Sequence, residues 1–204
     1  MDRLHIINLA LAKLGQDPVE NLNGPEKRLK TALTFFEPCR NMLMESYPWN
    51  FCIKRTRLNA ETYSDENNQT QFSRPAFGYK YQYALPKGFL RLLSSRELKY
   101  VWCGDCEEPV IEGTYLLTDE QGPLNIRYCA VVEDERLWPP LFVDAFALKL
   151  AGEICPNVEQ SKADKAILFN ELAAAVAQAK RVNAIQKPSL DLPPTDFEES
   201  RFWA

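Results

Sequence analysis

The residue types best able to do chemistry in this chain include one pair of closely spaced cysteines. Cys103 and Cys106 have the spacing of a metal-binding or redox pair. A structural zinc site needs four ligands, so a second pair of ligands would usually accompany this one. A redox-active pair of this spacing is expected next to a βαβ unit. Here Gly104 and Asp105 separate the cysteines between two predicted strands, which favours a turn. We therefore expect no metal and assign no metal ligand.

The single histidine, His5, lies in a predicted helix beside the apolar residues Leu4 and Ile7. No G-x-S-x-G segment supplies a nucleophile for it, so a position on the helix surface is favoured over a catalytic base. The sequence also lacks G-x-x-x-x-G-K-[ST] and G-x-G-x-x-G, the two common nucleotide-binding patterns. We assign no catalytic and no cofactor-binding residue, and expect no cofactor.

A compact basic group is formed by Lys54, Arg55 and Arg57. These residues could be the solvated outer face of a strand, or could meet acidic groups of an adjacent copy or of another protein. We favour the partner-binding interpretation. A contact with DNA fits less well, because a nucleic-acid-binding surface is normally basic and this chain has a net charge of -4.

Segments with the periodicity of helices lie before and after this basic group in the sequence. Apolar residues recur at steps of three and four positions, which is typical of one helix face. Asp2 and Gly15 have the residue types of a helix N-cap and a helix stop, Pro38 predicts a kink, and Pro156 predicts a helix end. The spacing predicts four helices: residues 4 to 14, 25 to 47, 141 to 154 and 161 to 185.

At Pro48 the helical period gives way to the alternation that is typical of a strand. Trp49, Phe51 and Ile53 alternate with more polar neighbours. Two large rings at a helix-to-strand corner usually pack into a core. We interpret Pro48, Trp49 and Phe51 as a structural joint between a helical half and a sheet half.

Short apolar segments after this joint predict an antiparallel meander. The polar segment 59 to 78 has no usable period and is predicted to be a long surface or interaction loop. A turn or bulge is expected at Glu112 and Gly113. The predicted strands are residues 79 to 85, 90 to 93, 98 to 102, 109 to 117 and 124 to 132.

The composition fits one domain with an appendage. The chain has 204 residues, of which 46% are hydrophobic and 25% charged. We predict an α+β fold in which a bundle of about four helices packs with the meander. Residues 1 to 187 form the domain, helical at 1 to 48 and 137 to 187 and β-rich at 49 to 136. Residues 188 to 204 form an extended C-terminal docking tail.

Export from the compartment of synthesis is not expected. No apolar run approaches the ~20 residues that cross a bilayer, and the first residues lack the pattern of a signal peptide. The six cysteines lie mostly in apolar segments and are expected to be reduced core residues.

The predicted tail contains three prolines, no helical period and an aromatic end. Left free, such a segment would be disordered. Phe197, Phe202 and Trp203 are, however, costly to expose and typical of binding anchors. We predict that they bind a partner.

Several segments, in their order along the chain, resemble the head-to-tail adaptor family of short-tailed bacteriophages, also called tail tubular protein A. The resemblance covers nearly the whole chain, although each segment is weak by itself. The segments are Leu-Ala-Lys-Leu-Gly (11 to 15), Pro-Trp-Asn-Phe (48 to 51) followed by Lys-Arg (54 and 55), Tyr-Ala-Leu-Pro (83 to 86), Ile-Arg-Tyr (126 to 128) and Leu-Trp-Pro-Pro-Leu-Phe-Val-Asp-Ala-Phe-Ala-Leu-Lys-Leu-Ala (137 to 151).

The resemblance implies a structural virion protein of the phage tail rather than an enzyme. It implies a homo-oligomeric ring, a dodecamer in the family, that is assembled in the host cytoplasm and lies beneath the portal vertex. Its expected partners are other copies of itself, the portal protein and the tail tube or nozzle protein. DNA would pass through the channel during genome ejection without specific binding, and no membrane is involved.

Two alternatives stay open: a soluble interaction protein outside any phage, and a virion-associated glycan or peptidoglycan hydrolase. That chemistry needs two acids separated by roughly 5 to 9.5 Å. Acid clusters occur at residues 107 and 108, 133 to 135, and 198 and 199. Each falls in a predicted turn or tail, where such clusters are usually solvated charge. We therefore assign no residue to hydrolysis.

Overall fold

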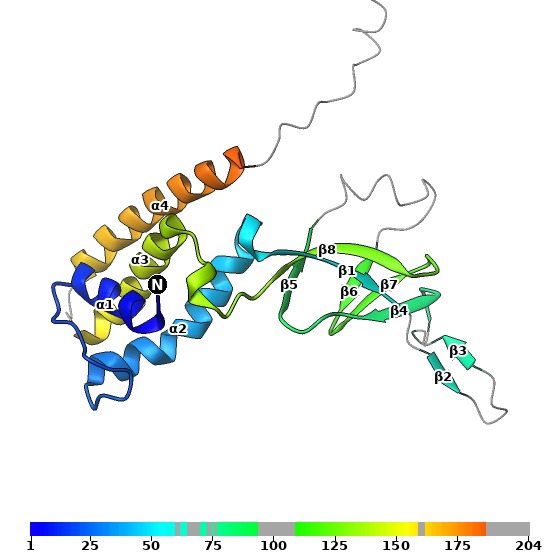
Figure 1. Cartoon of the computed structure of the whole chain (residues 1–204), viewed down its shortest axis with the longest axis horizontal. Helices are drawn as coiled ribbons and strands as arrows, with labels where there is room; N and C mark the ends of the chain where they lie inside the picture. Colours follow the sequence, from blue (N-terminus) through cyan, green and yellow to red (C-terminus); the bar gives the residue numbers. More distant parts are fainter. Residues whose placement is uncertain are drawn as a thin grey trace, which may run out of the picture.

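The computed structural model describes residues 1–59, 62–64, 70–72, 75, 77–93, 109–158 and 162–186. The predicted strand at 98 to 102, the Cys103 and Cys106 pair and the C-terminal tail lie outside these residues. In the described part the chain has a helical half and a β half arranged end to end (Figure 1). The predicted α+β class is confirmed.

The first two helices begin close to where the sequence predicted them. Helix α1 is Arg3–Lys13 and helix α2 is Lys27–Glu45. The Asp2 carboxylate caps α1 by accepting from the backbone N–H of His5 at 2.9 Å. Gly15 follows α1 with a φ of 67°, which favours glycine. Pro38 lies inside α2, so this segment is one helix.

Helix α3, Pro140–Val158, is the centre of the helical half. Helices α1, α2 and α4, Lys162–Ile185, all pack against it. The expectation that Pro156 ends α3 was wrong, because the helix continues to Val158. A proline in the last turn removes only one intrahelical hydrogen bond, so the helix tolerates it there.

The strands pair only in antiparallel fashion within the described part, but their order is not the consecutive order of a meander. In one sheet β8 lies between β1 and β5, and in another β7 lies between β4 and β6. The turn predicted at Gly113 joins β6 to β7, with a φ of 58°. The bounds are Ile53–Leu58 for β1, Tyr81–Ala84 for β4, Phe89–Leu92 for β5, Val110–Glu112 for β6, Tyr115–Thr118 for β7 and Leu124–Ala130 for β8.

Two of the predictions on the β half need correction. Within the predicted loop 59 to 78, strands β2, Thr62–Ser64, and β3, Thr70–Phe72, pair antiparallel. A strand of three residues is too short to show the alternation of apolar and polar residues by which strands are predicted. In addition, the strand predicted from Trp49 begins only at Ile53, because Asn50–Cys52 forms a 3₁₀ turn, η1.

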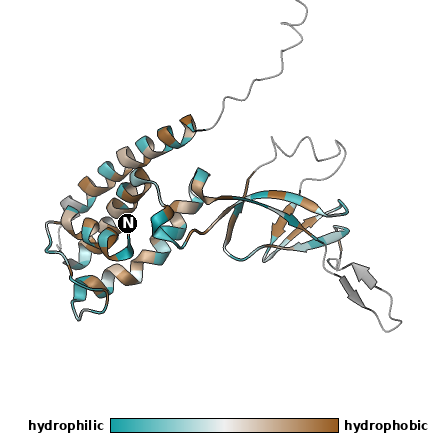
Figure 2. Cartoon of the chain, in the orientation of Figure 1, coloured by the Kyte–Doolittle hydropathy of each residue, from teal (hydrophilic) through white to brown (hydrophobic). Residues whose placement is uncertain are grey.

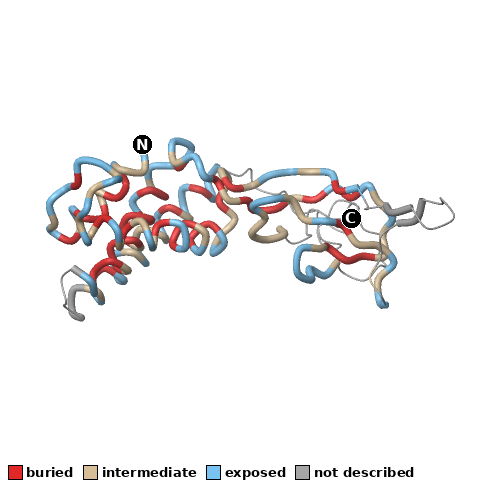
Figure 3. Tube along the Cα trace, turned by 90° about the horizontal axis from the view of Figure 1, so that it is seen from below, coloured by how far each residue is buried: buried red, intermediate tan, exposed pale blue. Residues whose placement is uncertain are grey.

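Each half has its own hydrophobic core (Figure 3). The helical core extends through the fully buried face of α3. The β core is organised around Tyr83, whose hydroxyl accepts from the N–H of Gly122 and donates to the carbonyl of Glu120. Its other buried members are Leu58, Leu116, Leu124, Ile126, Tyr128 and Ala130.

Candidate functional site

The chain crosses between the two halves twice, and a tryptophan marks each crossing. Trp49 precedes β1, and Trp138 follows a second 3₁₀ turn, η3, Glu135–Leu137, before α3. The indole N–H of Trp49 donates to the carbonyl of Leu43 at 2.9 Å, and that of Trp138 to the carbonyl of Val132 at 3.0 Å. Both rings are buried. Because a buried indole N–H needs an acceptor, each bond fixes its ring relative to the backbone.

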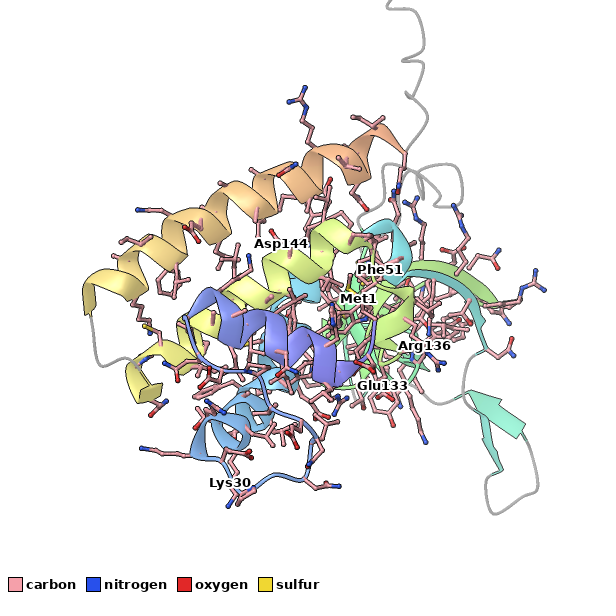
Figure 4. The ribbon with its side chains drawn as sticks, turned by 60° about the vertical axis from the view of Figure 1, so that its left-hand side comes forward. Met1, Lys30, Phe51, Glu133, Arg136 and Asp144 are labelled. Carbon is pink, nitrogen blue, oxygen red and sulfur yellow. The ribbon has the colours of Figure 1, made fainter. Side chains whose placement is uncertain are left out.

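Phe142 of α3 lies between the two crossings and contacts both tryptophans. Its ring centroid is 5.2 Å from that of Trp49, 5.4 Å from that of Trp138 and 4.8 Å from that of Phe51, all in edge-to-face geometry. Phe51 points toward α3 at the base of the β half (Figure 4). We name this cluster the aromatic joint; it comprises Phe36, Tyr47, Trp49, Phe51, Trp138, Phe142 and Phe146.

The end of α4 is bonded to the first crossing through a pair of asparagines. The backbone N–H of Asn50 donates to Oδ1 of Asn183 at 2.8 Å, and Nδ2 of Asn50 donates to the backbone carbonyl of Asn183 at 2.8 Å. Nδ2 of Asn183 also donates to the carbonyl of Pro48 at 3.5 Å. The last carbonyls of a helix lack intrahelical partners, so the bond from Nδ2 of Asn50 to the Asn183 carbonyl also caps α4. The predicted joint residues thus lie where α2, α3, α4 and β1 converge.

Strand register separates the predicted basic group. Successive side chains of a strand point to opposite faces. Lys54 is exposed but lies on the same face of β1 as Leu58, a buried residue of the β core. Arg55 and Arg57 lie on the opposite face. The structure therefore brings only two of the three predicted residues together.

Pairing with β8 and β5 adds two arginines that the sequence analysis did not select. Arg127 lies directly opposite Arg55, and Arg91 lies opposite Cys129 on the same face. We name Arg55, Arg57, Arg91 and Arg127 the arginine face. The alternation of Arg127 with the buried residues Ile126 and Tyr128 indicates an outward position, but only the strand pairing shows which face it shares.

The electrostatics of the arginine face follow from this crowding. Burial lowers the pKa of Arg127, and the neighbouring charge of Arg55 lowers it further. Nε of Arg57 donates to Oδ1 of Asn125 at 3.3 Å. Nε of Arg91 is buried and has no hydrogen-bond acceptor among the described residues. Like charges directly opposite each other destabilise a strand pair, and Arg55 and Arg127 occupy such positions.

The outer side of α4 is the second candidate surface. Leu168, Ala179 and Asn183 face inward and are buried. The rest of its surface is exposed and carries apolar side chains along the length of the helix (Figure 2), together with the polar residues Asn170, Glu171, Gln178 and Arg181. Its larger exposed apolar side chains are Ile167, Phe169, Val182 and Ile185. Small exposed side chains between them are Ala166, Ala173, Ala174, Ala177 and Ala184.

Two of the acidic residues at 133 to 135 form contacts that stabilise the fold. Glu135 pairs with Nε of Arg3 at 2.9 Å, and the carboxylate of Asp134 accepts from the backbone N–H of Arg136 at 3.1 Å. The hydrogen bond from the Arg136 side chain lowers the pKa of Asp134. A glycosidase acid needs the opposite shift. The other acid clusters lie outside the described residues.

Four of the cysteines are described, and all four are buried: Cys39, Cys52, Cys129 and Cys155. Burial raises the pKa of Cys39 to about 11. It also raises the pKa of Cys52, with a further contribution from Cys129. Since the thiolate is the nucleophile, these groups should be inert at neutral pH.

Iodoacetamide at pH 8 should therefore leave Cys39 and Cys52 unmodified in the native chain and alkylate both in urea. With a pKa about three units above the solution pH, only about one Cys39 thiol in a thousand is ionised. Peptide mass spectrometry of the two samples measures the difference. Native modification as fast as that of glutathione in the same tube would contradict the burial argument.

His5 is exposed on α1. Among the residues that the structure describes, no group of three His, Cys, Asp or Glu side chains could hold a metal ion. Within the same residues, no helix combines the length and the apolar character that crossing a membrane requires. Phe197, Phe202 and Trp203 lie outside them. No protein-family model and no curated protein matches this sequence.

Proposed function

We propose that this chain is a structural head-to-tail adaptor of a short-tailed phage and has no catalytic role of its own. Copies would form a closed ring, a dodecamer by analogy with the family, in the virion between the portal protein and the tail tube. The sequence resemblance motivates the proposal. The observation that carries it furthest is the exposed apolar side of α4 on a chain whose two halves already have separate cores.

A ring requires two different surfaces on each copy, because only a heterologous interface that repeats around an axis closes on itself. The outer side of α4 supplies one such surface, and its small alanines permit close approach of a neighbouring helix. Phe197, Phe202 and Trp203 would reach the portal, and the β half would face the next tail component. DNA would cross the channel without sequence-specific contact.

Light scattering coupled to size-exclusion chromatography tests the assembly, with the chain alone and mixed with the portal protein. The proposal expects a ring in at least the mixed sample. Replacing both Ile167 and Ile185 by aspartate should reduce ring formation at least tenfold, because these side chains are 57% and 74% exposed on the proposed interface. Phe77→Asp, at an 89% exposed position of the β half, is the matched control and should not affect assembly.

A chain that stays monomeric with the portal under all conditions would contradict the adaptor. Clearing of a cell-wall preparation by the purified chain, lost on substitution of a single Glu or Asp, would instead favour the hydrolase.

A further inference from the structure

We propose that the acidic C-terminal segment, residues 188 to 204, binds the arginine face of its own chain. This inference goes beyond the proposed ring, because it concerns each copy separately. It rests on the position of the arginine face, the point at which the C-terminal segment leaves α4, and the charges of that segment.

The arginine face concentrates positive charge on a chain whose net charge is -4. Arg55 and Arg57 are exposed, and Arg55 lies directly opposite Arg127 on the neighbouring strand. A guanidinium binds carboxylates through two parallel hydrogen bonds. An acidic peptide lying along β1 would thus meet the exposed guanidinium groups of Arg55 and Arg57.

The C-terminal segment starts beside the first residues that lead into β1. Asn183 of α4 is bonded to Asn50, and Nδ2 of Asn50 also donates to Oε1 of Gln186 at 3.3 Å. Asn50 precedes the first residue of β1, Ile53, by only three positions. Gln186, the last described residue, therefore lies near the base of the strand that carries Arg55 and Arg57.

Charge and spacing agree with this starting point. Residues 191 to 199 contain four acids and no basic residue. The first of them, Asp191, is five positions beyond Gln186, and Arg55 is five positions beyond Asn50. Extended chain covers ~3.3 Å per residue, so the segment spans ~56 Å against ~20 Å for β1. The acids are Asp191, Asp196, Glu198 and Glu199.

The prolines of the segment decide how it can bind. Pro193 and Pro194 have no backbone N–H and favour an extended conformation. They disfavour its addition as another strand of the sheet. Contact through carboxylates on the arginine face meets no such obstacle. Phe197 lies within the bound stretch and would reach the portal only after its release, whereas Phe202 and Trp203 lie beyond the acidic stretch.

Limited chymotrypsin digestion of the full chain tests the proposal, with cleavage after Phe197 followed by intact mass spectrometry. Replacing Arg55 and Arg57 by glutamate should accelerate cleavage about tenfold, because proteolysis follows the population of the released segment. The matched control replaces two exposed lysines of α2, Lys27 and Lys30, by glutamate, and should not change the rate. Circular dichroism checks that both variants keep the native helix content.

Two further measurements identify the occupant. The first reverses the charges on both sides: the Arg55→Glu, Arg57→Glu chain should return to slow cleavage when it also carries Asp196→Lys, Glu198→Lys and Glu199→Lys. The second adds 1 M NaCl, which should accelerate cleavage of the native chain because salt screens ion pairs. Equal rates for the native and glutamate-substituted chains would overturn the proposal. Protection that grows with protein concentration would also overturn it, because the acids would then bind a second copy. These readouts use the chain alone, so they remain interpretable if no ring forms.

Discussion

Replacing Phe142 by alanine should lower the free energy of unfolding by about 3–5 kcal/mol, the range for large aromatic residues in cores. Phe142 is 1% exposed, and its ring makes edge-to-face contacts with Trp49, Phe51 and Trp138. The substitution removes all three contacts and leaves a cavity at the point where both crossings meet α3. Urea unfolding followed by tryptophan fluorescence measures the loss.

The matched control is Phe169→Ala, which removes the same group from α4 at a position that is 46% exposed. Its cost should stay below about 1 kcal/mol, as for most surface substitutions. A similar cost at the two positions would show that the aromatic joint contributes no special stability. If Phe142→Ala does not fold, Phe142→Leu keeps most of the volume and should still lose stability, by less than Phe142→Ala would.

The helices could be predicted because local sequence determines much of their position. Asp2 and Gly15 bound α1 by capping chemistry that acts over one turn. The apolar stripe of α2 continues past Pro38, and the helix does too. Only the end of α3 was misplaced, because a proline in the last turn costs too little to stop a helix that is anchored by its buried face.

The β half was less predictable because its pairing joins distant segments. Strand β1 pairs with β8, so Ile53 lies opposite Cys129, far along the sequence. Without that register, Arg127 and Arg91 could not be placed beside Arg55. The separation of Lys54 from Arg55 needs only the alternation of side chains along one strand. The basic group was therefore recognised in the sequence, whereas the arginine face was not.

The 3₁₀ turn at the first crossing shows a tertiary contact overriding a local pattern. The alternation of Trp49 and Phe51 is compatible with a strand, but the backbone N–H of Asn50 bonds to Asn183 of α4 instead of to a neighbouring strand. The alternation therefore becomes a strand only from Ile53. The choice between these conformations depends on a residue more than a hundred positions away.

That contact supports the second prediction of large effect: Asn183→Ala should lower the free energy of unfolding by about 1–3 kcal/mol. Oδ1 of Asn183 is the acceptor for the Asn50 N–H, and the residue is 8% exposed. Alanine would leave that N–H without its acceptor in a partly buried site. Thermal and urea unfolding measure the loss.

Asn170→Ala is the matched control, since Asn170 is exposed on the same helix, and its effect should stay within about 0.5 kcal/mol. Equal effects of the two substitutions would mean that the Asn50–Asn183 pair adds no net stability. The Asn183 variant has a second consequence, because the same bonds fix the point where the C-terminal segment leaves α4. Cleavage after Phe197 should therefore accelerate in Asn183→Ala but not in Asn170→Ala, even where both chains remain folded.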